Sequence, residues 1–91
     1  MGREKAVINE IRHPYIVQLA VDSEGLDLEL NRRILGFHNS RRIKPRYGRS
    51  FTEAGRTYGR WCFSHLKTAR GFAEQFGGQI AARHSVKLER E

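Results

Sequence analysis

The sequence predicts a single α+β domain in which a four-stranded antiparallel sheet carries two helices on one face. Three observations predict this class. The chain has 91 residues, which is the length of one domain. Its hydrophobic fraction of 38% is enough for a compact core. Segments with the alternation of strands and with helical periodicity follow one another in the order strand, helix, strand, strand, helix, strand.

The N-terminal segment precedes this pattern. Residues 1–14 carry mixed charge and end at Pro14, and we interpret them as an arm in which residues 7–11 either add a short strand or remain loose. Residues 15–91 then form the domain. No linker or internal repeat divides them.

The first strand and the first helix are predicted between residues 15 and 38. Residues 15–21 are rich in β-formers and are followed by a turn-forming Asp-Ser-Glu-Gly stretch, which indicates a strand. Residues 26–38 carry apolar side chains at helical spacing, with acids early and bases late. This pattern predicts a helix capped by Ser23 or Asp27.

A hairpin is predicted next. Residues 42–51 alternate imperfectly and contain Pro45, which cannot donate to a ladder, so this strand belongs at a sheet edge. A short loop at 52–55 connects it to residues 56–63, the clearest strand pattern in the chain.

The last two elements are a helix and a strand. Ser64 is a suitable N-cap for a helix over 65–76, and Gly77 with Gly78 supplies its left-handed stop. Residues 79–88 alternate again and predict a final strand with one buried face.

This order of elements is that of the ferredoxin-like βαββαβ unit. The first and third strands are then central, the second and fourth are edges, and both helices cover one face. The alternation predicts the core residues Val17, Leu19, Val21, Trp61, Phe63, Ile80, Ala82 and Val86 on the sheet, with Leu30, Ile34, Phe37, Leu66, Ala69, Ala73 and Phe76 on the helices.

The opposite face of the sheet, which we call the open face, is expected to be basic. Six of its predicted members are cationic and none is acidic. The chain as a whole has ten acidic residues and a formal net charge of +7, so the acids are expected to lie elsewhere. Like charges on one sheet face repel one another, and a bound polyanion relieves that repulsion. The predicted members are Ile16, Gln18, Lys44, Arg46, Arg56, Tyr58, Arg60, Cys62, Arg83 and Lys87. The pair Arg41-Arg42 either is solvated charge or extends this face.

The segment Arg-Thr-Tyr-Gly-Arg-Trp-Cys-Phe at 56–63 resembles the third-strand octamer of RNA-recognition-motif domains. It has the leading basic residue, the aromatic at the third position, the glycine at the fourth and the aromatic at the eighth. Thr57 replaces a glycine of that pattern, and Arg60 stands where the family has a stacking aromatic. The resemblance implies that Tyr58 stacks on a base and that Arg56 contacts a phosphate.

Catalytic and metal-binding patterns are weak. Cys62 and His65 form one Cys-x-x-His pair, whereas zinc sites need several such ligands. We therefore expect no enzymatic activity, no metal and no cofactor.

The expected function is binding of single-stranded RNA or DNA through the open face. The expected nucleic-acid-binding residues are Lys44, Arg46, Arg56, Tyr58, Arg60, Arg83 and Lys87. The alternative is a homodimer or a module that binds an acidic protein partner. Burying unpaired cations face to face is costly, which disfavours a simple dimer through this face.

Overall fold

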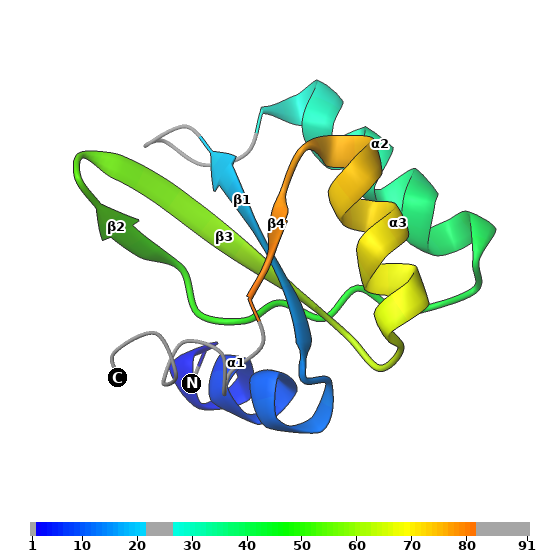
Figure 1. Ribbon diagram of the computed structural model, residues 1–91, viewed down its shortest axis with the longest axis horizontal. Coiled ribbons are helices and arrows are strands. Elements are labelled where there is room, and N and C mark those ends of the chain that lie inside the picture. The colour runs from blue at the N-terminus through cyan, green and yellow to red at the C-terminus, as the bar shows by residue number, and fades with distance from the viewer. Residues whose placement is uncertain (1, 22–26, 82–91) are drawn as a thin grey trace.

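The computed structural model describes residues 2–21 and 27–81 of the chain and shows an α+β fold with a four-stranded antiparallel sheet, as predicted (Figure 1). A third helix, α1, precedes the elements expected from the sequence. In chain order the elements are α1 (Gly2–Arg12), β1 (Tyr15–Val21), α2 (Leu28–Ser40), β2 (Phe51–Glu53), β3 (Arg56–Phe63), α3 (Leu66–Phe76) and β4 (Gln79–Ile80).

Helix α1 overturns the interpretation of residues 1–14 as an arm with a strand or loose chain at 7–11. Within the helix Glu10 is fully buried, and Ala6, Val7 and Asn9 are partly buried. The most deeply buried of these side chains is charged, so apolar periodicity does not reveal the buried side of the helix. The helix ends at Arg12 because His13 precedes Pro14, a position that disfavours helical backbone.

The sheet has the strand order β2-β3-β1-β4. Strands β1 and β3 are therefore central, the places expected for the first and third strands. They pair antiparallel along the whole of β1, from Tyr15 opposite Phe63 to Val21 opposite Thr57. The short strand β4 pairs with β1 through Val17 and Ile80. The remainder of the predicted strand at 79–88 lies outside the described residues beyond position 81.

The predicted second strand is largely wrong. Strand β2 begins only at Phe51, and before it Tyr47 makes an isolated bridge to Trp61. On either side of the bridge, the N–H of Gly48 donates to the Arg60 carbonyl at 2.9 Å, and the N–H of Cys62 donates to the Arg46 carbonyl at 2.8 Å. The residues before β2 therefore run beside β3 without forming a regular ladder.

The core lies between the sheet and the two helices α2 and α3, which Figure 1 shows side by side. Phe72 is fully buried in this core, although it is not among the core residues predicted from the sequence. The expected core residues Leu66 and Ile80 are instead 36% and 38% exposed. Ala82 and Val86 lie outside the described residues. The fully buried core is Val17, Leu19, Ile34, Phe37, Trp61, Phe63, Ala69 and Phe72.

The helix ends show which capping predictions hold. Asp27 caps α2, accepting hydrogen bonds from the backbone N–H groups of Glu29 and Leu30 at 3.2 and 3.3 Å. Gly77, with a φ of 77°, ends α3 in the left-handed conformation as predicted. The predicted cap Ser64 is wrong: His65 occupies the N-cap position and its side chain makes no capping hydrogen bond.

Candidate nucleic-acid interface

The face of the sheet opposite α2 and α3 is partly closed, contrary to the prediction of an open face. Ile16 is 1% exposed and Cys62 is 3% exposed. On this side Glu10 of α1 reaches Arg60 of β3. The alternation along β1 and β3 is as predicted, but the same alternation now directs these residues toward α1 instead of solvent.

Glu10 joins α1 to the sheet. Its carboxylate is fully buried and accepts hydrogen bonds from the backbone N–H of Arg49 at 2.7 Å and from the Arg49 guanidinium at 2.8 Å. The Arg60 guanidinium contacts it at 3.3 Å. Burial alone would raise the pKa of Glu10, but the hydrogen bonds from Arg49 and the charges of Arg60 and Arg49 lower it below its ordinary value. Glu10 is therefore ionised at neutral pH.

Arg60 therefore contributes to the contact between α1 and the sheet. Its side chain is only 16% exposed, it donates to the Gln18 side chain at 3.2 Å, and Glu10 balances its charge. The expectation that Arg60 faces solvent is wrong, because no local sequence pattern indicates that an acid lies above this face.

Tyr58 is half-buried and already has an aromatic partner. Its ring stacks on Phe51, with centroids 5.1 Å apart and planes at 17°. The Arg60 guanidinium lies 4.8 Å from the Phe51 centroid. Phe51 and Tyr58 are opposite one another in the β2–β3 pairing, so the short strand β2 assembles this stack. Arg56 is exposed at the start of β3, opposite Glu53.

A basic strip runs between α2 and β2. Residues 41–49 contain five cations and no acid. Arg41 lies over the Phe37 ring at 3.7 Å, and Arg49 pairs with Glu10. Among the described residues, no carboxylate lies within ion-pair distance of the other three cations. The strip comprises Arg41, Arg42, Lys44, Arg46 and Arg49.

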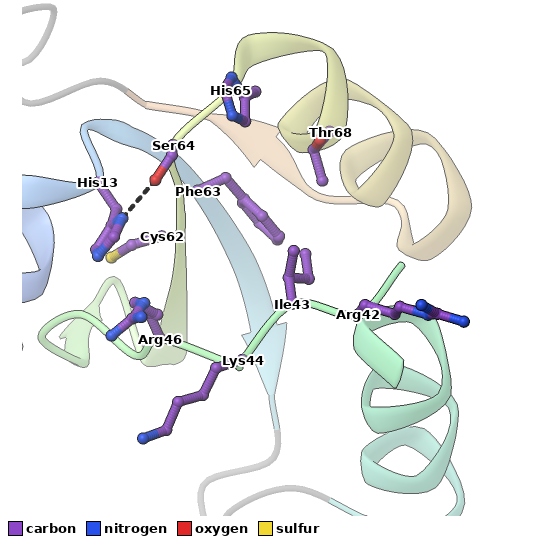
Figure 2. A pocket seen from close by; sticks show the side chains of 10 residues that line it. All are labelled: His13, Arg42, Ile43, Lys44, Arg46, Cys62, Phe63, Ser64, His65 and Thr68. Carbon is purple, nitrogen blue, oxygen red and sulfur yellow. Dashed lines mark hydrogen bonds between the residues drawn. The ribbon is translucent and has the colours of Figure 1, made fainter. Parts of the chain in front are cut away.

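A pocket of about 420 Å³ opens beside the strip (Figure 2). It is bounded by the end of α1, the strip, the end of β3 and the first turn of α3. No acid is among the described residues that line it. Those residues are His13, Arg42, Ile43, Lys44, Arg46, Cys62, Phe63, Ser64, His65 and Thr68.

One side of the pocket is polar. The imidazole Nδ1 of His13 is 2.6 Å from the Ser64 hydroxyl, the hydrogen bond drawn in Figure 2, where Cys62 and Arg46 lie close to it. Burial, followed by the charges of Arg46 and Arg12, lowers the pKa of His13. Burial and then the Glu10 charge raise the pKa of the Cys62 thiol to about 12. The thiol is therefore protonated at neutral pH and is a poor nucleophile.

A second histidine, His38, is buried in the core beside this region. Its Nδ1–H donates to the Ile34 carbonyl at 2.8 Å, and its ring stacks on Phe63 with centroids 5.5 Å apart. Its Nε2 has no hydrogen-bond partner among the described residues. Burial is the main cause that lowers the pKa of His38, so the ring is neutral at neutral pH.

The structure thus divides the predicted site residues. Lys44 and Arg46 come together at the pocket, Tyr58 and Arg60 lie on the α1 side of the sheet, and Arg56 is at the hairpin. Arg83 and Lys87 lie outside the described residues. The pocket residues His13, Arg42 and His65 were not predicted as site residues, although the run of cations at 41–49 is visible in the sequence.

Within residues 2–21 and 27–81, no group of three or more His, Cys, Asp or Glu side chains is placed to hold a metal ion. No helix in these ranges has the length and apolar character needed to cross a bilayer. Comparison with protein-family models, curated proteins and solved structures finds no match to the chain.

Proposed function

We propose that the protein binds single-stranded nucleic acid without catalysis, through the basic strip and not through the whole sheet face. The observation that carries this proposal is that Arg42, Lys44 and Arg46 have no carboxylate within ion-pair distance among the described residues and border a pocket without acids. Cations left unpaired in this way gain most from phosphates, because binding releases the counterions of the nucleic acid.

Aromatic groups beside the strip support a single-stranded ligand. Tyr47 lies within the strip and is 45% exposed, and the Phe51–Tyr58 stack is on the neighbouring strands. Base stacking on such rings tolerates any sequence and requires unpaired bases. The resemblance of residues 56–63 to the RNA-recognition-motif octamer is a second argument for this ligand class, with Tyr58 and Arg56 in the roles that it implies.

The arrangement of elements also supports a ferredoxin-like assignment for residues 15–80. Strands β1 and β3 are central, β2 and β4 are edges, and α2 and α3 cover one face. In this assignment α1 is an addition on the other face. A cytoplasmic location is part of the proposal and is supported by the single cysteine of the chain.

The alternative homodimer through the open sheet face is disfavoured by α1. Glu10 is buried between α1 and the sheet, and Ile16 and Cys62 are already covered. A second sheet would have to displace α1 and its ion pairs before it could pack there. Sedimentation velocity at several concentrations should therefore show a monomer.

Fluorescence anisotropy with labelled single-stranded RNA and DNA tests the proposal. The variant Lys44→Ala/Arg46→Ala should weaken binding about tenfold at low salt, as the loss of two phosphate contacts implies. The matched control is Arg32→Ala/Arg70→Ala, which removes the same charge from exposed positions on α2 and α3. Equal weakening by both variants, or no binding by the wild-type protein, would overturn the proposal. Binding to an acidic protein in place of nucleic acid would support the alternative partner.

A further inference from the structure

The pocket beside the strip has the size of a binding site for a small molecule or a single nucleotide. Its volume of about 420 Å³ falls within the range of about 300–1,000 Å³ that ligand pockets occupy. Four segments bound it: the end of α1, the strip, the end of β3 and the first turn of α3. A pocket bounded on these four sides suits the terminal nucleotide of a nucleic-acid strand better than an internal nucleotide, from which the sugar-phosphate backbone must leave in two directions.

The polar side of the pocket fits a dianion. His13, Ser64 and Arg46 come together there, and His65 stands at the start of α3 (Figure 2). The first turn of a helix presents N–H groups that favour negative charge. A terminal phosphomonoester carries about −1.5 to −2 charges at neutral pH, more than the single charge of a linking phosphodiester. The absence of acids among the described lining residues therefore favours the terminal phosphomonoester.

The other side of the pocket is apolar. Ile43 and Phe63 project toward one another in the middle of Figure 2, below Thr68. The charged ends of Arg42 and Lys44 extend outward from the rim of the pocket. There they can contact the phosphates of a nucleic-acid strand that continues along the strip. Phe63 is only 3% exposed, so the apolar group that a base can lie against is the half-buried Ile43, while its phosphate reaches the polar side.

We propose that this pocket receives the phosphorylated terminal nucleotide of a nucleic-acid strand, with the phosphomonoester at His13, Ser64 and Arg46 and the base against Ile43. The inference rests on the proposed function, because it adds recognition of the strand end to binding along the strip. The same phosphomonoester chemistry is present in a free nucleoside monophosphate.

The test compares oligonucleotides of one sequence that end in a 5′-phosphate, a 3′-phosphate or hydroxyls only, with adenosine monophosphate as a free competitor. One phosphorylated form should bind about tenfold more tightly than the hydroxyl form, the gain expected from a charge-assisted hydrogen bond. Equal affinity for all three oligonucleotides would overturn the inference and leave the proposed function intact. Binding of adenosine monophosphate without any oligonucleotide binding would overturn the proposed function and identify a free nucleotide as the ligand.

A matched pair of variants locates the effect. Ser64→Ala removes the hydroxyl that bonds His13 and should reduce the preference for the phosphorylated end to about twofold, because that contact of the phosphate is lost. Ser50→Ala makes the same change at an exposed position outside the pocket and should keep the full preference. His13→Ala is the second pocket variant and should likewise reduce the preference for the phosphorylated end to about twofold. An unchanged preference in both pocket variants would exclude the pocket as the site.

Discussion

Replacing Glu10 by glutamine should destabilise the protein by loosening α1 from the sheet. The side chain is fully buried and holds Arg49 and Arg60. Removing one partner of a buried ion pair costs about 3–5 kcal/mol. The Arg49 side chain is 44% exposed, so water can hydrate its charge when Glu10 is replaced. The Arg60 side chain is only 16% exposed, so its charge is hydrated less. Glutamine also keeps an oxygen for the Arg49 N–H, so we expect a loss of about 2 kcal/mol in the free energy of unfolding.

Urea unfolding followed by the fluorescence of Trp61 measures this loss. Trp61 is the only tryptophan and is 2% exposed, so its emission reports unfolding of the core. The control is Glu4→Gln, at an exposed position on the same helix, which should change stability by less than about 0.5 kcal/mol. An equally small change for Glu10→Gln would refute the reasoning, because Glu10 would then not anchor α1.

The pH dependence of stability should also show that Glu10 anchors α1 to the sheet. The pKa of Glu10 is lower in the folded protein than its ordinary value of 4.5. A carboxyl of this kind stabilises the fold above its unfolded pKa and loses that contribution as pH falls through its folded pKa. Below about pH 4.5, the wild-type protein should therefore lose stability more steeply than Glu10→Gln.

Three other predictions concern the core and the sheet edge. Because burial lowers the pKa of His38 below 6.5, stability should fall as pH drops below that value, and His38→Phe should show a shallower fall in pH-dependent urea unfolding. Gly78→Ala should lower the free energy of unfolding by about 1–3 kcal/mol, since the new Cβ would lie 2.7 Å from the Gln18 carbonyl oxygen. Gly36→Ala, which has open space around it, should raise the free energy of unfolding by up to about 1 kcal/mol. Iodoacetamide should modify Cys62 only after unfolding, as measured by mass spectrometry, and rapid modification of the native protein would contradict its burial.

The parts of the fold with strong apolar alternation were predictable. Residues 56–63 form β3 with the expected bounds, and Trp61 and Phe63 point into the core as their parity required. Helix α1 was missed because its inward side is made by polar residues such as Asn9 and Glu10, which find hydrogen-bond partners about forty positions along the chain. Such partners lie too far away in sequence for local periodicity to show them.

The candidate site was predictable only where one segment supplies it. Lys44 and Arg46 were expected as phosphate ligands and line the pocket. His13 and His65 join them from α1 and from the start of α3, so only the folded chain brings these groups together. The expectation for Arg60 failed for the same reason, because its acid partner belongs to a helix that the sequence did not indicate.

The salt dependence of binding to a single-stranded oligonucleotide tests the central claim most directly. Each phosphate contact on a single strand contributes about −0.7 to the slope of log affinity against log salt concentration. Arg42, Lys44 and Arg46, which have no ion-pair partner among the described residues, therefore predict a slope of about −2 for the wild-type protein. In Lys44→Ala/Arg46→Ala the slope should be less negative by about 1.4. A wild-type slope near zero, or the same slope in both proteins, would contradict the account.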